Sequence, residues 1–213
     1  MVVSDLEGTM TTDISALYYA KSAGKLADAK RVFDHLLEED KRISCEAKTI
    51  DEFIKMKEKS LKLHLEEGAR LLEGSPSSIL NVQLKPSKFY PKIFELGKRD
   101  KNLSIVTCTD ERTAARFFEG QNIPYNIAAS SKLKTDSSGL LTGEFERYCG
   151  GTAKANAYQG REDVVVDSNI DLPLCKKAIE NGRRVYAVNN GSSIEETFIT
   201  NLEKFVIDYS HLS

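Results

Sequence analysis

The sequence predicts an α/β protein, in which helices cover both faces of a parallel β-sheet and a helical block is inserted after the first strand. Two observations point to this class. Beyond about residue 84, short apolar runs rich in β-branched residues alternate with helical segments, which is the pattern of a parallel sheet buried on both faces. From about residue 14 to 73, apolar residues recur at helical spacing and no strand-like run intervenes.

The chain opens on a short apolar strand that ends in an acid. Val2 and Val3 lead into Asp5, and a polar, turn-like stretch covers residues 8–13. Helical periodicity then continues, with a capping box at residues 49–52, until the Gly-Ser-Pro-Ser-Ser stretch at 74–78 breaks it. We therefore expect two domains, a helical cap at residues 14–84 and an α/β core made of residues 1–13 and 85–213.

The remaining elements follow in alternation along the core segment. After a helix that ends near residues 96–97, strands are expected at 103–107, 123–129, 164–166 and 185–188, a hairpin around 139–145, and helices at 112–119, 153–158 and 172–179. In the segment 194–213 we expect a helix and a short apolar strand, which would form a sheet edge or a packing element. Three strands end in Asp5, Thr107 or Asp167. Because ligands bind beyond the carboxyl ends of parallel strands, we expect these side chains to share one site.

Composition and charge exclude several classes of protein. The chain of 213 residues suits one α/β domain with an inserted module. Its net charge of −2 gives no reason to expect binding to nucleic acid or to an acidic membrane surface, and no apolar run approaches the length of a membrane span. No signal peptide is apparent, and the four cysteines are scattered, which favours a reducing cytoplasm. We expect a cytoplasmic monomer or homodimer.

The first strand end carries a pair of acids, Asp5 and Glu7. A carboxylate at this place can attack phosphorus, and a second acid two residues on can protonate the leaving oxygen and then activate water. Gly8 and Thr9 follow in a turn that can present a hydroxyl and N–H groups to a phosphate. Such an acid pair also arises by chance as solvated surface charge, so the motif alone is only moderately specific.

The other strand ends and one helix start supply further candidates. Thr107, with the adjacent N–H groups around Cys108, can hold a phosphoryl oxygen, although a threonine there is often structural. Lys154 follows two glycines at a predicted helix start. It can neutralise charge on a nucleophile and a phosphate, or be an ordinary surface lysine. Asp167 and Asp171 follow a buried strand and suit a hard cation such as Mg²⁺; helix N-capping would explain one of them.

Taken in order, these residues resemble the four motifs of the haloacid dehalogenase superfamily, and especially its phosphoserine-phosphatase-like branch. The resemblance covers residues 2 to about 190. It implies a Rossmann-like three-layer core with a cap inserted after the first strand. The motifs are Asp5-Leu6-Glu7-Gly8-Thr9, Thr107, Gly150-Gly151-Thr152-Ala153-Lys154 and Asp167-Ser168-Asn169-Ile170-Asp171.

The resemblance also implies a role for each motif residue. Asp5 would be the nucleophile, Glu7 the general acid/base, and Lys154 the group that orients nucleophile and phosphate. The phosphoryl group would be bound by Thr107, Cys108, Gly8, Thr9 and Lys154. An Mg²⁺ ion would be held by Asp5, the Glu7 carbonyl, Asp167 and Asp171, and the substrate would be a small phosphorylated metabolite.

Three departures separate this chain from the family pattern. Glu7 stands where an aspartate is usual, and Val166 stands where a glycine often precedes the metal aspartate. Ile14 replaces the glutamate that phosphoserine phosphatases place nine residues after the nucleophile, and Arg31, Arg42 and Arg70 do not align with their cap arginine. From the motifs and the resemblance together, we expect a phosphatase that acts through an aspartyl-phosphate. Phosphoserine is the first substrate to test. The alternatives are a phosphotransferase, a non-catalytic phospho-ligand binding protein and, least favoured, a dehalogenase.

Overall fold

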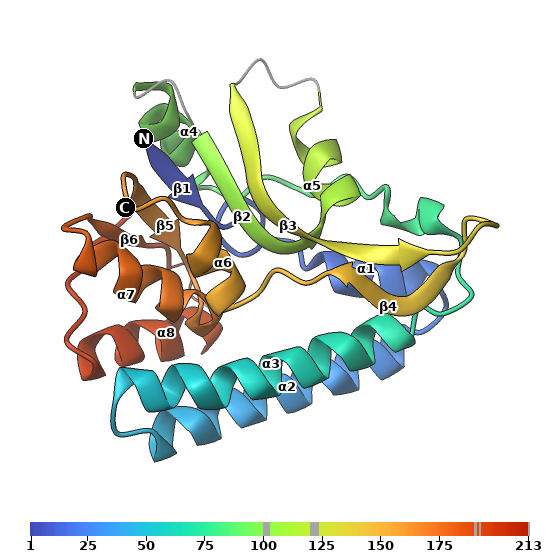
Figure 1. Ribbon diagram of the computed structural model, residues 1–213, viewed down its shortest axis with the longest axis horizontal. Coiled ribbons are helices and arrows are strands. Elements are labelled where there is room, and N and C mark those ends of the chain that lie inside the picture. The colour runs from blue at the N-terminus through green and yellow to red at the C-terminus, as the bar shows by residue number, and fades with distance from the viewer. Residues whose placement is uncertain (100–102, 120–123, 190, 192, 213) are drawn as a thin grey trace.

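The computed structural model describes residues 1–99, 103–119, 124–189, 191 and 193–212. Within them, seven strands form one sheet in the order β4-β3-β2-β1-β5-β6-β7, as Figure 1 shows. The pairs are parallel except for β3 and β4, which are antiparallel. The strands are β1 (Val2–Ser4), β2 (Leu103–Asp110), β3 (Tyr125–Thr135), β4 (Leu141–Arg147), β5 (Asp163–Val166), β6 (Val185–Ala187) and β7 (Ser210–His211). The predicted α/β class with a mostly parallel sheet is confirmed.

The central strands are buried on both faces because neighbouring apolar residues point to opposite sides of the sheet. Val3 and Val106 join one hydrophobic cluster, whereas Val2 and Ile105 join another. Helices α4 (Tyr90–Arg99) and α5 (Glu111–Phe118) pack in the second cluster, and α7 (Leu172–Glu180) and α8 (Ser193–Lys204) pack in the first. The result is the three-layer core that the sequence predicts.

The inserted block consists of three α-helices and a short 3-10 helix. The α-helices are α1 (Ser15–Ser22), α2 (Leu26–Glu46) and α3 (Ile50–Arg70). Thr49 and Glu52 form the expected capping box at the start of α3. The long helices α2 and α3 lie side by side below the sheet in Figure 1. Their ends near Ile43 and Phe53 join the cluster of α7 and α8, so the block is anchored to the core.

The β3–β4 hairpin leaves the parallel sheet and contacts α3. Leu133 and Leu141 of the hairpin are buried with Tyr19 of α1 and with Ala69 and Leu72 at the end of α3. The hairpin predicted around residues 139–145 is therefore present, and it extends farther than the pattern suggested. It shares a hydrophobic cluster with the inserted helices.

Several element boundaries differ from the prediction; β2, for example, ends at Asp110 instead of at residue 107. The strand expected at 123–129 runs over 125–135 instead, because it continues into the hairpin; residue 123 lies outside the described residues. The last strand, expected to be apolar, consists of Ser210 and His211, both exposed. It pairs only with β6 at the edge of the sheet, where neither residue needs to be apolar. The edge position itself is as predicted.

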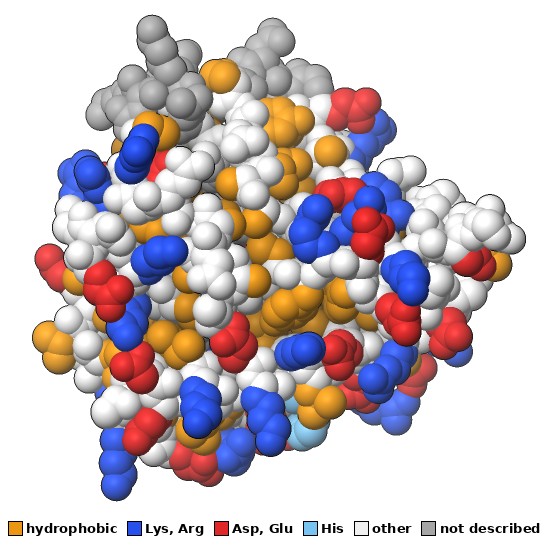
Figure 2. All heavy atoms as spheres, viewed as in Figure 1, with side chains coloured by type: hydrophobic (Ala, Val, Ile, Leu, Met, Phe, Trp, Pro, Cys, Tyr) orange, Lys and Arg blue, Asp and Glu red, His pale blue; other side chains and the backbone are white. Residues whose placement is uncertain are grey.

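The visible surface mixes charges of both signs. In Figure 2, lysine and arginine side chains alternate with acidic ones over this face, and hydrophobic side chains gather above the α2–α3 pair. Among the described helices, none is both long enough and apolar enough to cross a membrane.

Candidate active site

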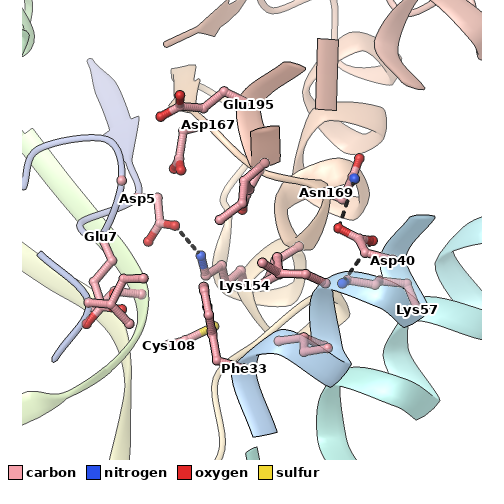
Figure 3. A pocket seen from close by; sticks show the side chains of 18 of the residues that line it. Asp5, Glu7, Phe33, Asp40, Lys57, Cys108, Lys154, Asp167, Asn169 and Glu195 are labelled. Carbon is pink, nitrogen blue, oxygen red and sulfur yellow. Dashed lines mark hydrogen bonds and ion pairs between the residues drawn. The ribbon is translucent and has the colours of Figure 1, made fainter. Parts of the chain in front are cut away.

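A cavity of about 270 Å³ lies where the carboxyl ends of the central strands face the inserted helices α1, α2 and α3, which are referred to below as the cap. Asp5, Thr107 and Asp167, the three predicted strand-end residues, all line it. The cap contributes side chains from α2 and α3, including Phe33, Asp40 and Lys57, as Figure 3 shows. The expectation that three strand ends share one site is thus met by the fold.

Asp5 and Lys154 form the centre of the cavity. The Lys154 Nζ lies 2.7 Å from Asp5 Oδ2 and 2.8 Å from Asp171 Oδ1. The other oxygen of Asp5, Oδ1, accepts the backbone N–H of Leu6 at 2.7 Å. Lys154 belongs to α6 (Thr152–Ala157) and is only 1% exposed, so the alternative of an ordinary surface lysine is wrong.

The carboxylate of Asp167 is held by the turn after β1. Thr9 Oγ1 donates to Asp167 Oδ1 at 2.6 Å. Gly8 has a φ of +76°, and a Cβ at this position would lie 1.9 Å from Asp167 Oδ2. A glycine is therefore required both for the turn and for the close approach of the two strand ends. Thr9 is fully buried behind the cavity, and its hydroxyl contacts Asp167.

Helix capping does not explain the second acid pair. Asp171 stands at the N-cap of α7, but its side chain makes no capping hydrogen bond. It accepts instead from Lys154 and from Ser168 Oγ. The carboxylates of Asp5, Asp167 and Asp171 each offer an oxygen within 4.8 Å of the others, and all three residues are buried.

Burial is the main cause of a raised pKa at two of these acids, Asp5 and Asp167. Burial raises the pKa of Asp5 to about 7, although the Lys154 ammonium acts to lower it. Burial and the neighbouring Asp5 and Asp171 carboxylates hold the pKa of Asp167 well above its usual range. Burial alone would lower the pKa of Lys154, but Asp171 and Asp5 raise it well above its usual value, so the lysine is a cation.

The acid cluster has the composition of a divalent-cation site. Three buried carboxylates surround one ammonium group, which leaves an excess of negative charge when all three acids are ionised. Oxygen donors of this kind suit a hard cation such as Mg²⁺. Asp5, Asp167 and Asp171 therefore fit the metal that the sequence predicts, and the unbalanced carboxylates are the observation that favours it.

Glu7 reaches the cavity from the turn after β1 but points toward α1. Its Oε1 accepts the backbone N–H of Ser15 at 2.9 Å, at the first residue of α1. Burial raises the pKa of Glu7, and hydrogen bonds from Ser15 partly offset this effect. The longer side chain lets the carboxyl group remain at the cavity wall while it contacts the helix. A raised pKa suits a group that must deliver a proton.

Thr107 and Cys108 lie on β2, next to the strand that leads into Asp5, and both line the cavity. The Thr107 hydroxyl donates to Thr109 Oγ1 at 2.9 Å and also accepts the Thr109 N–H. Burial raises the pKa of the Cys108 thiol, so it is neutral and acts as a small polarisable wall. Both residues stand where the sequence placed them, and binding of a phosphoryl group there remains a prediction.

A second charged group on the cap side was not identified from the sequence. Lys57 Nζ of α3 lies 2.9 Å from Asp40 Oδ1 of α2, and Asn169 donates to Asp40 Oδ2 at 3.1 Å, as drawn in Figure 3. Asp40 and Lys57 are 6% and 5% exposed. The only signal in the sequence was a charged residue on the apolar side of each helix. This group ties the cap to the loop between Asp167 and Asp171.

Comparisons with known proteins give matches among solved structures only. No protein-family model and no curated protein matches the sequence. A substrate-bound phosphoserine phosphatase superposes with a TM-score of 0.62 at 16% identity, over 92% of this chain and 89% of its own. A phosphoserine phosphatase representing a phospho-aspartyl intermediate gives 0.62 at 15% identity, with the same coverage. A protein of unknown function from Bordetella pertussis Tohama I gives 0.65 at 16% identity over 100% of this chain and 98% of its own.

These similarities extend over nearly the whole chain. A haloacid dehalogenase family hydrolase from Salmonella enterica serovar Typhi also matches, with a TM-score of 0.65 at 13% identity. It is aligned over 92% of this chain and 64% of its own. At these identities the comparison establishes architecture, and the chain therefore has the fold of the haloacid dehalogenase hydrolases, including the phosphoserine phosphatases.

Proposed function

We propose that this protein is a magnesium-dependent phosphatase that hydrolyses a small phosphate monoester through an aspartyl-phosphate on Asp5. The observation that carries the proposal is the fixed Asp5 carboxylate. Its two oxygens are held by Lys154 and by the Leu6 N–H, in a cavity that also contains Asp167. A nucleophile oriented in this way pays little entropy to reach the phosphorus atom.

In the first step, an oxygen of Asp5 attacks phosphorus and the bond from phosphorus to the ester oxygen breaks. Glu7 in its protonated form gives a proton to the departing oxygen, which leaves as an alcohol. The raised pKa of Glu7 favours this protonated form. Lys154 holds Asp5 throughout and offsets the charge that gathers on the phosphoryl oxygens.

In the second step, water attacks the phosphorus of the aspartyl-phosphate. Glu7, now a carboxylate, accepts a proton from the water, inorganic phosphate leaves, and the Asp5 carboxylate is restored. A divalent cation bound by Asp5, Asp167 and Asp171 would neutralise phosphoryl charge. Thr107 and the backbone around Cys108 are expected to contact the same oxygens.

The experiment is a panel of phosphorylated metabolites, phosphoserine among them, assayed for phosphate release with Mg²⁺. Wild type should hydrolyse at least one member, and Asp5→Asn should abolish this activity. Asp51→Asn is the matched control, because Asp51 lies on the exposed side of α3 and pairs with Lys176; it should retain activity.

Three results would contradict the proposal in different ways. Hydrolysis that survives in Asp5→Asn would exclude the covalent mechanism. A product that depends on an added alcohol would identify a phosphotransferase. Binding of phosphorylated ligands without any turnover would identify a binding protein on the same fold. The expected setting, a cytoplasm rich in small phosphorylated metabolites, is part of this proposal.

A further inference from the structure

We propose that the alcohol part of the substrate is apolar, so that the protein acts on phosphate monoesters of hydrocarbon-like alcohols. The inference rests on the proposed function for the reacting end of the substrate. Its own basis is a second cavity, which adjoins the first and is lined mainly by hydrocarbon.

The second cavity has a volume of about 120 Å³. It lies between the three cap helices and the β3–β4 hairpin, under the cluster that contains Tyr19, Ala69 and Leu133. The two cavities adjoin, because several residues line both of them. The residues that line both are Glu7, Ile14, Phe33, Leu36 and Cys108. A molecule whose phosphate lies beside Asp5 would therefore extend past Glu7 into this space.

The walls of the second cavity offer few polar groups to a ligand. Its apolar lining residues include Ile14, Leu17, Val32, Phe33, Leu65 and Phe145. The buried polar side chains already have partners in the protein, namely Thr113 for Tyr19, Ser60 and His35 for His64, and Arg112 for Asp110. A polar ligand group placed here would lose its hydration without gaining a partner, which costs free energy.

The charged residues of the cap do not provide a site for an amino acid either. Among the described residues that line the two cavities there is no arginine of the cap. Arg31 and Arg42 instead form exposed ion pairs within α2. Asp40 and Lys57 do reach the first cavity, but they neutralise each other. The ammonium and carboxylate groups of a phosphorylated amino acid that extended past Glu7 would thus meet mainly hydrocarbon.

Glu7 lies at the junction of the two cavities, where the ester oxygen of such a substrate would be. Its carboxyl group is fixed there by the Ser15 N–H at the start of α1. The acid that protonates the leaving group is therefore adjacent to both the phosphate and the hydrocarbon. In the reaction, water and the ester give inorganic phosphate and a free apolar alcohol.

Gly68 gives direct experimental access to the second cavity. It lies in α3 and lines the cavity, and no atom lies within 4 Å of a Cβ built there. Gly68→Leu should fill the space, and Gly68→Ala should fill part of it with little risk to folding. Glu67→Leu is the matched control, because Glu67 is the exposed neighbour on the same helix and does not line either cavity.

The test measures both turnover and binding. Turnover of n-alkyl phosphates from methyl to hexyl is compared with turnover of phosphoserine, and affinities for the matching n-alkyl phosphonates, which are not hydrolysed, are measured by calorimetry with Mg²⁺. For wild type and Glu67→Leu, we expect kcat/KM and affinity to rise by up to about fourfold per added methylene group. Gly68→Leu should flatten the series, with Gly68→Ala between the two.

The outcomes separate this inference from the proposed function. A flat series in wild type, or phosphoserine turned over faster than hexyl phosphate, would overturn the inference while an Asp5-dependent activity still supported a phosphatase. Affinity for phosphonates that rises with chain length, without turnover of any ester, would support an apolar ligand and overturn the phosphatase. A Gly68→Leu variant that folds normally and keeps the wild-type slope would also overturn the inference.

Discussion

The core side of the first cavity presents charged side chains, among them Asp5, Lys154 and Asp167, whereas the cap side presents mainly hydrocarbon. On the core side, Asp5, Asp167 and Asp171 converge on Lys154, and each comes from a loop or helix that follows a strand. On the cap side, the lining comes from helices that pack against one another, with a single mutually neutralised pair of Asp40 and Lys57.

In the proposed function, the core side carries out the reaction and the cap side selects the substrate. The two sides can therefore be built from different kinds of side chain. Charge on the core side cannot be removed without changing the chemistry, because Asp5 and Asp171 share the same lysine partner. Charge on the cap side serves to join two helices and a loop, and in principle apolar side chains could do the same. Substitutions on the two sides should therefore have different consequences.

The largest effect is expected for Lys154→Met. This change leaves the buried Asp5 and Asp171 carboxylates without their ammonium partner, so we expect a loss of about 3–5 kcal/mol in the free energy of unfolding and no detectable turnover. Chemical denaturation measures the first and phosphate release the second. Lys176→Met, which removes an exposed ion pair to Asp51, should cost about 0–1 kcal/mol and keep activity. Equal stability of the two variants would mean that Lys154 does not stabilise the Asp5 and Asp171 carboxylates.

The next effect concerns Glu7. Glu7→Gln keeps the shape of the side chain but cannot transfer a proton, so kcat should fall by roughly 10²- to 10⁴-fold. Glu7→Asp should retain part of the activity, although the shorter side chain loses the Ser15 N–H contact. Both are measured from steady-state rates on the best substrate of the panel. Full activity in Glu7→Gln would show that another group supplies the proton.

Metal removal should change the pH dependence of stability. Burial raises the pKa of Asp5 from 3.8 to about 7 in the folded protein. Between these two pH values, the folded state thus binds more protons than the unfolded state. The metal-free protein should therefore lose stability as the pH rises from about 4 to 7. Asp5 contributes at most ~4 kcal/mol to this loss. Added Mg²⁺ should raise the melting temperature more at pH 8 than at pH 5. A larger gain at pH 5 would contradict the assignment of the acid cluster to the metal.

The smallest loss of stability is expected for the double substitution of Asp40 and Lys57 on the cap side. Asp40→Leu or Lys57→Met alone leaves a buried charge unpaired and should cost about 3–5 kcal/mol. The double variant should be more stable than either single variant, and Asn169, which donates to Asp40, accounts for a residual loss of about 1–3 kcal/mol. Denaturation of the four proteins in the double-mutant cycle gives the coupling. Additive losses would mean that Asp40 and Lys57 do not stabilise each other.

The same contrast explains how much could be predicted from the sequence. The strand ends at Asp5, Thr107 and Asp167 could be located because a buried parallel strand is a short apolar run, and the fold brings such ends to one edge. The burial of Lys154 could not be predicted, since two glycines and a helix start also precede surface lysines. The Asp40–Lys57 pair depends on how α2 and α3 pack, and helical spacing alone places neither residue opposite the other.

Long-range packing also explains the elements that were only partly predicted. The hairpin was expected from the sequence, but its packing against α3 requires contacts between residues such as Ala69 and Leu141, which are far apart in sequence. The second cavity arises from the same packing. Its lining residues read as ordinary apolar helix positions in the sequence, and only the folded chain shows that they surround a space beside Glu7.

The central claim is that Asp5 carries the phosphoryl group during turnover. The most direct test is an acid quench of the reaction with a radiolabelled phosphate ester, followed by peptide mapping, in wild type and in Glu7→Gln. The account predicts label on the peptide that contains Asp5. With an aryl ester, whose leaving group departs without a proton, the Glu7→Gln variant should hold more label, because only hydrolysis of the intermediate is then slowed. Sustained turnover with no label at Asp5, together with undiminished activity in Asp5→Asn, would contradict it.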